Sequence, residues 1–585
     1  MFYKIVEFLR RKYKNDIVQI ITIENNMRCS MDIDQLYEAW CKKVSEPDLM
    51  EELNLIRHQE KEIESRFYKQ LSFGTAGLRA EVGVGCARMN VYTVSKATQG
   101  LAQYLKKQGL KSGVAIACDS RRKSTEFAQV AACVLAQSGI KAYLFDQIMP
   151  TPVLSFTVRH LHCDAGIVVT ASHNPKEYNG YKVYNEQGGQ ITDQMAHAIA
   201  EEMQDVAELD VQRMDYDQAI EQNKIIMIGD EVLSAYVENV MTLKDSCTEK
   251  ERKQLKVVYS PLHGTGAKPV QIVLKQAGFT DVHPVEVQCV PDTEFSTLRL
   301  PNPEEVDALK MAIEQAKACG ADLVIATDPD ADRMGTAIRN AEGEYVPLTG
   351  NQIGCLLLNN RLRDLKAQDK LQKDDFIVKS IVTTQLVKSM ADAYGVKLYN
   401  VLTGFKYIGE KIEQYGQEHQ FIFGFEESYG FLAGTFVRDK DAVIASLLLC
   451  QAAAKAKAEG KTLLDELDLL LKTYGYHAER VKSYTLQGME GAKRIKEIMR
   501  TLREQPPKQI AGSRVIENKD YAPGIDGFPC SDVLYYTLEN DQWVCVRPSG
   551  TEPKIKFYGG AKGKDVFESR KILDDIIAWS DAVVG

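Results

Sequence analysis

The feature that most constrains this fold is a repeated pattern: a short apolar strand that ends in a loop of charged or hydroxyl-bearing residues. Helical segments alternate with apolar, β-branched runs between residues 91 and 170, and the pattern restarts near 256 and again near 350. Such alternation predicts parallel strands joined by crossover helices. In open sheets of this kind, ligands bind just beyond the carboxyl ends of the strands. The pattern therefore predicts an α/β protein with its functional groups in these loops.

The individual elements follow from hydrophobic periodicity. Strands are expected at 114–118, 142–145, 166–169, 256–259, 323–326, 376–378 and 421–423. Helices are expected at 91–108, 124–138, 151–160, 303–318 and 350–359. After residue 472 the pattern changes to strands at 483–486, 533–538 and 543–546, with helices near 490–503 and 565–579. This last region indicates a smaller α+β domain.

A length of 585 residues is too great for one hydrophobic core and predicts several domains. We expect an N-terminal helical extension over 1–70, with one or two amphipathic surface helices in 32–70, and four domains after it. The expected domains cover 71–230, 231–346, 347–472 and 473–585. Residues 1–30 resemble an upstream extension, so Met31 is a candidate natural start.

Composition excludes several classes of protein. A net charge of −9 argues against a nucleic-acid binder, which usually carries a basic face. The 13 cysteines are scattered without a Cys-x-x-Cys pair, which indicates a reduced, cytoplasmic protein. No stretch approaches the roughly 18 apolar residues that a membrane-spanning helix needs. We therefore expect small-molecule partners, without nucleic acid or membrane; nothing in the sequence fixes an oligomeric state.

Two loops carry the most specific chemistry. The sequence Thr-Ala-Ser-His-Asn-Pro at 170–175 follows the strand at 166–169, which places Ser172 at a strand end. Asp328, Asp330 and Asp332 alternate directly after the strand at 323–326. Three adjacent carboxylates repel one another unless a cation joins them, and oxygen ligands suit Mg²⁺. An EF-hand calcium loop is excluded, because its required Gly and Glu positions hold arginines here.

Further loops indicate phosphate binding. Arg547, Ser549, Gly550 and Thr551 combine a positive charge, two hydroxyl groups and unobstructed backbone, which is a phosphate cradle. A glycine-rich loop at 73–79 ends in Arg79, and a Pro-Leu-His-Gly-Thr-Gly loop at 261–266 follows another strand. Walker and dinucleotide-binding glycine motifs are absent. Together, a hydroxyl nucleophile, a metal site and a phosphate cradle indicate phosphoryl transfer.

The chain resembles the α-D-phosphohexomutases from about Phe73 to the C-terminus. The resemblance rests on four loops that occur in the family's order, at 170–175, 328–333, 426–428 and 547–552. The Thr-Gly-Phe-Lys sequence at 403–406 is similar to that of the glucose-selective members, so the bacterial α-phosphoglucomutases are the most similar branch. The resemblance implies three similar α/β mixed-sheet domains and a C-terminal α+β domain around a central cleft.

The resemblance also implies a role for each matching residue. Ser172 would be a phosphoserine that exchanges a phosphoryl group with glucose 1-phosphate and glucose 6-phosphate through glucose 1,6-bisphosphate. Its phosphate would bind one Mg²⁺ together with Asp328, Asp330 and Asp332. The catalytic groups around it would be His173, Lys182, Lys440, Arg79 and Arg333. The substrate-binding groups would be Thr403, Gly404, Lys406, Glu426, Ser428, Arg547, Ser549, Gly550 and Thr551.

Other functions stay open on the sequence alone. The enzyme could prefer mannose or a pentose phosphate, because only the resemblance favours glucose. A Mg²⁺-dependent sugar phosphatase would use the same aspartates, although no Asp-x-Asp pair follows a strand near the N-terminus. A catalytically silent sugar-phosphate sensor is disfavoured, because every expected catalytic position is filled.

Overall fold

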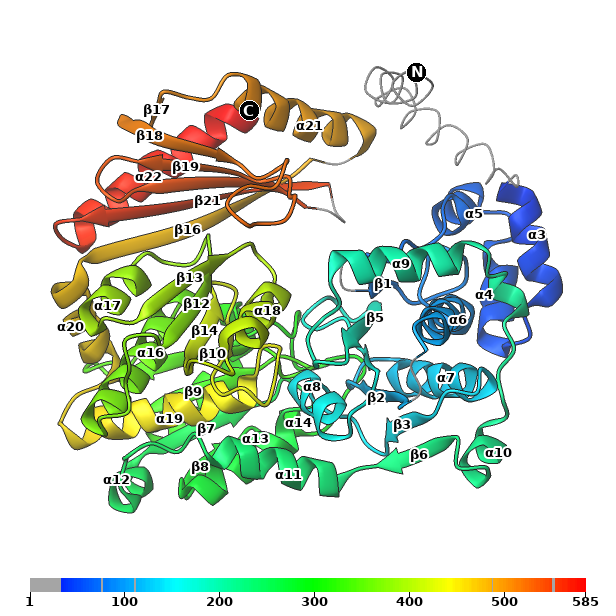
Figure 1. Ribbon diagram of the computed structural model, residues 1–585, viewed down its shortest axis with the longest axis horizontal. Helices are drawn as coiled ribbons and strands as arrows, with labels where there is room; N and C mark the ends of the chain where they lie inside the picture. Colours follow the sequence, from blue (N-terminus) through cyan, green and yellow to red (C-terminus); the bar gives the residue numbers. More distant parts are fainter. Residues whose placement is uncertain (1–32, 75–76, 110–111, 487, 550–552) are drawn as a thin grey trace, which may run out of the picture.

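The structure is a computed structural model that describes residues 33–74, 77–109, 112–486, 488–549 and 553–585 (Figure 1). Four β-sheets follow one another along the chain, each covered by helices (Figure 1). They lie within residues 77–228, 256–347, 376–432 and 476–563. The domain limits given above stay a prediction, and the candidate start at Met31 lies outside the described residues.

The first sheet has the strand order β1-β5-β4-β2-β3-β6. Its strands are β1 (Gly77–Glu81), β2 (Val114–Cys118), β3 (Ala142–Phe145), β4 (Ala165–Val169), β5 (Tyr178–Asn185) and β6 (Ile225–Ile228). Its covering helices include α6 (Val91–Lys107), α7 (Ser124–Gln137), α8 (Thr151–His160) and α9 (Asp193–Gln204). Strands β2, β3, β4 and β6 are parallel; β5 pairs antiparallel with β4, and β1 pairs antiparallel with β5.

The second and third sheets repeat this arrangement. The second has the order β11-β10-β9-β7-β8, and the third has the order β13-β12-β14-β15. The second contains β7 (Lys256–Ser260), β8 (Asp281–Pro284), β9 (Leu323–Thr327), β10 (Met334–Arg339) and β11 (Tyr345–Pro347). The third contains β12 (Phe376–Ser380), β13 (Lys397–Val401), β14 (Phe421–Glu426) and β15 (Gly430–Leu432). Their main helices are α11 (Asp230–Met241), α13 (Ala267–Ala277), α15 (Val306–Cys319), α16 (Gly350–Ala367), α17 (Leu386–Tyr394), α18 (Phe405–Tyr415) and α19 (Ala442–Ala458).

Each of these three sheets contains the same kind of hairpin. The parallel strands β4, β9 and β14 pair with the antiparallel strands β5, β10 and β15 that follow them in the chain. The parallel strands were predicted, and their antiparallel partners were not. β5 shows why: its sequence Tyr-Asn-Gly-Tyr-Lys-Val-Tyr-Asn has no continuous apolar run, although all but its two end residues are buried. Three of the four loops expected to be functional, at 170–175, 328–333 and 426–428, are therefore hairpin turns at equivalent places.

The C-terminal region is a separate antiparallel layer, as the α+β prediction required. Its sheet has the order β16-β21-β20-β19-β18-β17, and every pair in it is antiparallel. The strands are β16 (Tyr476–Thr485), β17 (Gln509–Ile510), β18 (Ser513–Asp520), β19 (Leu534–Leu538), β20 (Trp543–Pro548) and β21 (Lys554–Gly563). They carry α21 (Gly488–Glu504) and α22 (Val566–Val584), and lie above the third sheet in Figure 1.

The described part of the N-terminal extension contains three helices, where one or two were expected. They are α3 (Ile33–Lys43), α4 (Pro47–Ile56) and α5 (Glu60–Phe67). Their apolar faces join the hydrophobic core of the first sheet, where Trp40 is fully buried and its ring meets Phe67 and Tyr92 edge-on. These helices are therefore an integral layer of the first domain.

Helix α19 ties three sheets together. Its residues from Ala442 to Ala454 are buried, and they share one hydrophobic cluster with α8, α11, α13 and α16.

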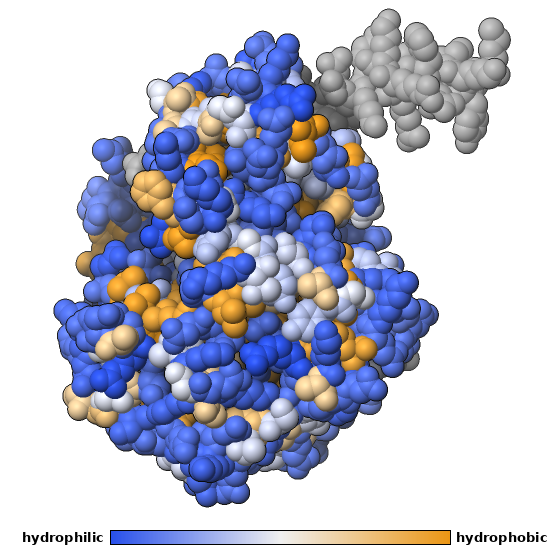
Figure 2. Space-filling view, turned by 90° about the vertical axis from the view of Figure 1, so that its left-hand side faces the viewer, coloured by the Kyte–Doolittle hydropathy of each residue, from blue (hydrophilic) through white to orange (hydrophobic). Residues whose placement is uncertain are grey.

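The face in Figure 2 is mainly hydrophilic, with hydrophobic residues in small separate groups. Among the described residues, no helix combines the length and apolar character that crossing a membrane requires.

Candidate active site

Ser172 lies in the turn between β4 and β5, where its side chain reaches the second sheet. Its hydroxyl donates a hydrogen bond of 2.7 Å to Asp328 Oδ2 and lies 3.1 Å from His173 Nδ1. The backbone is left-handed here, with φ of 53°, and the Ser172 N–H donates to the Thr170 hydroxyl at 2.8 Å. A non-glycine residue in this conformation stores strain that the surrounding contacts must support. The surrounding contacts therefore hold Ser172 in a backbone conformation that is uncommon for residues other than glycine.

A buried arginine supplies much of that support. Arg121 donates to the carbonyl oxygens of Ser172 and Asn174, both at 2.5 Å, and to those of Pro175 and Tyr178 at 2.8 and 3.2 Å. Its guanidinium is paired at 3.3 Å with Asp119, which also accepts from the Thr170 hydroxyl at 2.6 Å. Neither Arg121 nor Asp119 was predicted from the sequence as a site residue. Asp119 directly follows the strand at 114–118, and Arg121 lies two residues further on. The pattern that identified Ser172, a polar residue just beyond a buried strand, could therefore have identified them as well.

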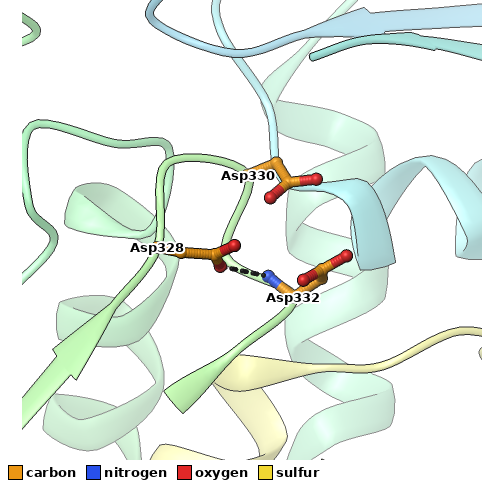
Figure 3. A group of neighbouring side chains, drawn as sticks. All are labelled: Asp328, Asp330 and Asp332. Carbon is orange, nitrogen blue, oxygen red and sulfur yellow. Dashed lines mark hydrogen bonds between the residues drawn. The ribbon is translucent and has the colours of Figure 1, made fainter. Parts of the chain in front are cut away.

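The three aspartates converge as the sequence predicted. One oxygen from each of Asp328, Asp330 and Asp332 lies within 4.8 Å of the others, and all three residues are buried on one loop (Figure 3). Asp328 Oδ1 accepts the backbone N–H groups of Asp332 and Arg333 at 3.0 and 2.9 Å. Asp330 Oδ1 and Asp332 Oδ1 are buried, and neither accepts a hydrogen bond from the described residues. Buried carboxylate oxygens without donors are the ligands that a hard divalent cation requires.

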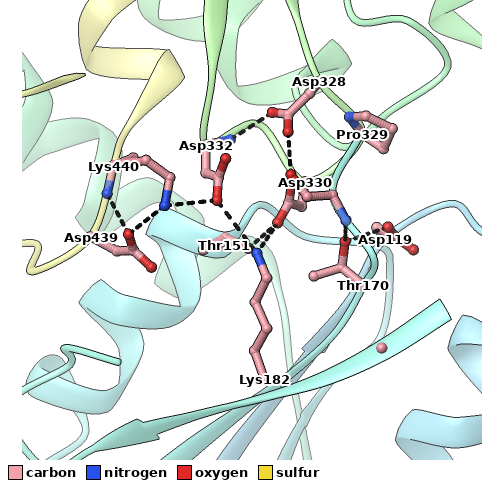
Figure 4. A network of polar contacts seen from close by, with 12 residues as sticks. Asp119, Thr151, Thr170, Lys182, Asp328, Pro329, Asp330, Asp332, Asp439 and Lys440 are labelled. Atoms are coloured by element: carbon pink, nitrogen blue, oxygen red, sulfur yellow. Dashed lines mark hydrogen bonds and ion pairs between the residues drawn. The ribbon is translucent and has the colours of Figure 1, made fainter. Parts of the chain in front are cut away.

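Two buried lysines face the same cluster (Figure 4). Lys182 Nζ lies 2.7 Å from Asp330 and 3.4 Å from Asp332, and Lys440 Nζ lies 3.2 Å from Asp332. Burial alone would lower the pKa of both lysines, but the surrounding carboxylates outweigh it and raise both pKa values. Asp439 also holds Lys440, at 2.9 Å. Both lysines are therefore protonated donors at neutral pH.

The pKa values of Asp328 and His173, the two side chains nearest the Ser172 hydroxyl, are shifted in opposite directions. Burial, and then the neighbouring Asp330 and Asp332, raise the pKa of Asp328 well above its ordinary value. Burial and the positive charges of Arg333 and Arg79 lower the pKa of His173 well below its ordinary value. His173 is thus neutral at pH 7 and can accept a proton next to Ser172.

A cleft of about 670 Å³ opens beside this cluster. Groups from all four sheets or their loops line it, including His173, Arg333, Thr403, Gly404, Glu426, Ser428, Lys440 and Arg547. Within it, Glu426 Oε1 accepts the Gly404 N–H at 2.7 Å, which connects the loop at 403–406 to the loop at 426–428. The cleft has the size of a small-ligand site.

The other expected site residues either lie away from the aspartate cluster or fall outside the residues that the structure describes. Arg79 is on β1 and donates to the Asn174 side chain at 3.3 Å. The ammonium of Lys406 contacts Asp193 at 2.6 Å rather than lining the cleft, so its substrate-binding role stays a prediction. The Ser549 N–H donates to the Lys554 carbonyl at 2.8 Å. Gly550 and Thr551 are outside the described residues.

Comparisons with known proteins agree with this architecture. Three family profiles match in order, described as phosphoglucomutase/phosphomannomutase alpha/beta/alpha domains I, II and III, over residues 70–210, 234–343 and 349–474. The fold and the site define a multidomain α/β phosphotransferase of the isomerase type. The chain belongs to the phosphoglucomutase/phosphomannomutase family, within the α-D-phosphohexomutase superfamily, which confirms the resemblance.

Individual relatives extend over nearly the whole chain. A phosphoglucomutase of Staphylococcus aureus strain MRSA252 is 40% identical over 571 residues, which cover 94% of this chain and 98% of that one. The fold is similar to a family protein from Burkholderia thailandensis, with a TM-score of 0.65, 18% identity and coverage of 87% and 97%. It is also similar to the phosphoglucomutase parafusin from Paramecium, with a TM-score of 0.67, 19% identity and coverage of 88% and 95%.

Proposed function

We propose that this enzyme interconverts α-D-glucose 1-phosphate and glucose 6-phosphate through a phosphoserine at Ser172 and a glucose 1,6-bisphosphate intermediate. The observation that supports this most is the contact between Ser172 Oγ and the buried Asp328 carboxylate at the edge of the cleft. A serine beside three carboxylates and two lysines suits repeated phosphorylation and dephosphorylation. The 40% identity to a relative named phosphoglucomutase supports glucose as the sugar.

Asp328, Asp330 and Asp332 would hold one Mg²⁺ together with the phosphate on Ser172. Their donor-free oxygens fit this role. A phosphoserine adds about −1.5 to −2 charges to a site that already contains three carboxylates. When bound, the cation would neutralise this charge and so lower the barrier to phosphoryl transfer.

The chain's own residues would move the protons. His173 is neutral and lies next to Ser172 Oγ, so it can take the serine proton when the phosphoryl group returns to the enzyme. Lys182 and Lys440 are protonated and buried beside the aspartates, so they can donate to an oxygen that leaves phosphorus. Arg79 and Arg333 add positive charge near the transferring group.

The cleft would bind the sugar in two orientations. Glu426, Ser428 and Thr403 line it and offer oxygens to the sugar hydroxyls. Arg547, with Ser549, Gly550 and Thr551, would bind the phosphate that does not react. Because these groups contact either end of the bisphosphate, the intermediate can turn over and present its second phosphate to Ser172. Binding energy at the distal phosphate can then be used at the reacting centre.

Ser172→Ala tests the proposal directly. We expect it to abolish the production of glucose 6-phosphate, measured by coupled oxidation, while the melting temperature stays close to wild type. Full activity in this variant would rule the proposal out.

Relative kcat/KM on glucose, mannose and ribose 1-phosphates tests the choice of sugar. Release of free phosphate in place of isomerised sugar would identify a phosphatase. We also place the enzyme in the cytoplasm, with sugar phosphates as its partners.

A further inference from the structure

The Pro-Leu-His-Gly-Thr-Gly loop at residues 261–266 has no role in the function proposed above. It follows β7, which is the parallel neighbour of β9 in the second sheet. Loops at the carboxyl ends of adjacent parallel strands lie side by side. The loop at 261–266 therefore packs against the aspartate loop at 328–332, and its contacts concentrate on one residue, Pro329.

Thr265 holds the carbonyl group of Pro329 with two donors. The Thr265 backbone N–H and the Thr265 hydroxyl donate to this one oxygen at 2.8 and 2.9 Å. Thr265 is buried, so no bulk water competes for that oxygen. Pro329 stands between Asp328 and Asp330, and the next carbonyl, that of Asp330, accepts the Thr151 N–H at 2.9 Å. The backbone on both sides of Asp330 is thus anchored, by Thr265 before it and by Thr151 after it.

The loop lies close against Pro329 at Gly264. A Cβ added to Gly264 would lie 2.4 Å from Pro329 Cα, so a side chain at this position would push the two loops apart. Leu262 and His263 both have left-handed backbone, with φ of 47° and 65°. The His263 ring fixes this turn, because its nitrogens lie 2.8 Å from the Val290 carbonyl and 2.7 Å from the Thr297 hydroxyl. The loop is therefore a rigid support and not a free connection.

We propose that Thr265 is a positioning residue for the metal-binding loop. Its hydroxyl fixes the Pro329 peptide, and that peptide sets the direction in which the Asp328 and Asp330 carboxylates converge on one divalent cation. The inference deepens the proposed function and rests on it. Groups that orient metal ligands without touching the metal commonly change its affinity by about 10- to 100-fold.

The test measures metal binding directly, without turnover. Free Mn²⁺ is quantified by electron paramagnetic resonance during titration of the full-length, dephosphorylated protein. Thr265→Val keeps the shape of the side chain and the backbone donor but removes the hydroxyl, so the Mn²⁺ Kd should rise roughly tenfold. Thr265→Ser restores the hydroxyl and should stay within about twofold of wild type. Gly264→Ala should also weaken binding, because its added methyl group displaces Pro329.

The outcomes separate this inference from the function on which it rests. Wild-type Mn²⁺ affinity in Thr265→Val, or equal weakening in Thr265→Ser, would overturn the inference and leave the proposed function standing. Wild-type protein that binds no Mn²⁺ would overturn the metal assignment, and the inference with it. If Thr265→Val gives no folded protein, Thr265→Ala removes the same hydroxyl with less bulk and carries the same expectation.

Discussion

The Ser172 hydroxyl donates a hydrogen bond of 2.7 Å to Asp328, although the two residues belong to different sheets and are 156 positions apart. Each lies in the turn of a hairpin that joins a parallel strand, β4 or β9, to the antiparallel strand that follows it. Two equivalent hairpins thus face each other across a domain junction, and the third contributes Glu426 to the same cleft. The candidate site depends on how the sheets are packed together, and several variants test that packing.

Arg121→Lys should impair catalysis more than folding. A lysine cannot reproduce the fork that contacts four carbonyls around Ser172, so the turn should shift. A displacement of about 1 Å can cost about 10²-fold in rate, and we expect a loss of that order in kcat. Arg122→Lys is the matched control, because Arg122 is the exposed neighbour. An unchanged kcat in Arg121→Lys would show that the clamp is dispensable.

Lys182→Met should destabilise the metal-free protein. It leaves Asp330 without its 2.7 Å ion-pair partner, and removal of one member of a buried pair typically costs about 3–5 kcal/mol. Lys107→Met breaks the exposed pair with Glu202, which should cost no more than about 1 kcal/mol. Urea unfolding of both variants measures the difference. Equal free energies of unfolding would contradict the electrostatic account of the cluster.

Asp441→Asn should alter how stability depends on pH. Burial raises the pKa of Asp441, the N-cap of α19, to about 7. Between about pH 4 and pH 7 the folded chain keeps a proton that the unfolded chain releases, so this group makes folding less favourable as pH rises. The asparagine variant lacks that penalty. Relative to wild type, it should gain stability from pH 4 to pH 8, by up to about 4 kcal/mol.

The control for this experiment is Asp215→Asn, which changes an exposed N-cap on α10 (Tyr216–Glu221). Its free energy of unfolding relative to wild type should not show the Asp441 trend. A constant difference between Asp441→Asn and wild type across the same pH range would mean that Asp441 does not hold its proton in the folded protein.

Lys406→Met tests a role that the structure leaves as a prediction. Lys406 pairs with Asp193 at the start of α9, so its ammonium joins the first and third domains. If it also binds substrate, as the resemblance implies, its loss should raise KM about tenfold, which corresponds to about 1.4 kcal/mol. Lys411→Met changes a lysine on the same helix that lies outside the cleft lining. An unchanged KM would restrict Lys406 to the domain contact.

Local sequence patterns predicted much of this molecule. The strands β2 and β3 and the helix α8 were placed at their observed ends. Continuous apolar runs define the two strands, whereas α8 mixes apolar and polar residues. Ser172 and the three aspartates were found because polar residues directly follow buried strands. The aspartate triad meets at one point because its loop is short and all three residues are on it.

The remaining features depend on tertiary contacts that no local pattern encodes. β5 is buried although it contains two asparagines and a lysine, and its Lys182 and Tyr184 side chains bond to Asp330 and Asp439, which lie far along the chain. Lys406 belongs to the Thr-Gly-Phe-Lys motif at 403–406, but its ion-pair partner Asp193 is 213 positions away and could not be predicted from that motif. Thr265 acts through the carbonyl of Pro329, and a backbone acceptor leaves no mark in the sequence. The N-terminal helices were expected as one or two amphipathic helices on the surface, because helical periodicity alone does not show that the apolar face with Trp40 joins the core of the first sheet.

The most direct test of the account is the intact mass of the protein before and after incubation with glucose 1,6-bisphosphate and Mg²⁺. We predict that dephosphorylated wild-type protein gains the mass of one phosphoryl group, that fragmentation places it on Ser172, and that glucose 6-phosphate then removes it. Ser172→Ala should gain nothing. A wild-type protein that isomerises glucose 1-phosphate without ever carrying phosphate on Ser172 would contradict the central claim.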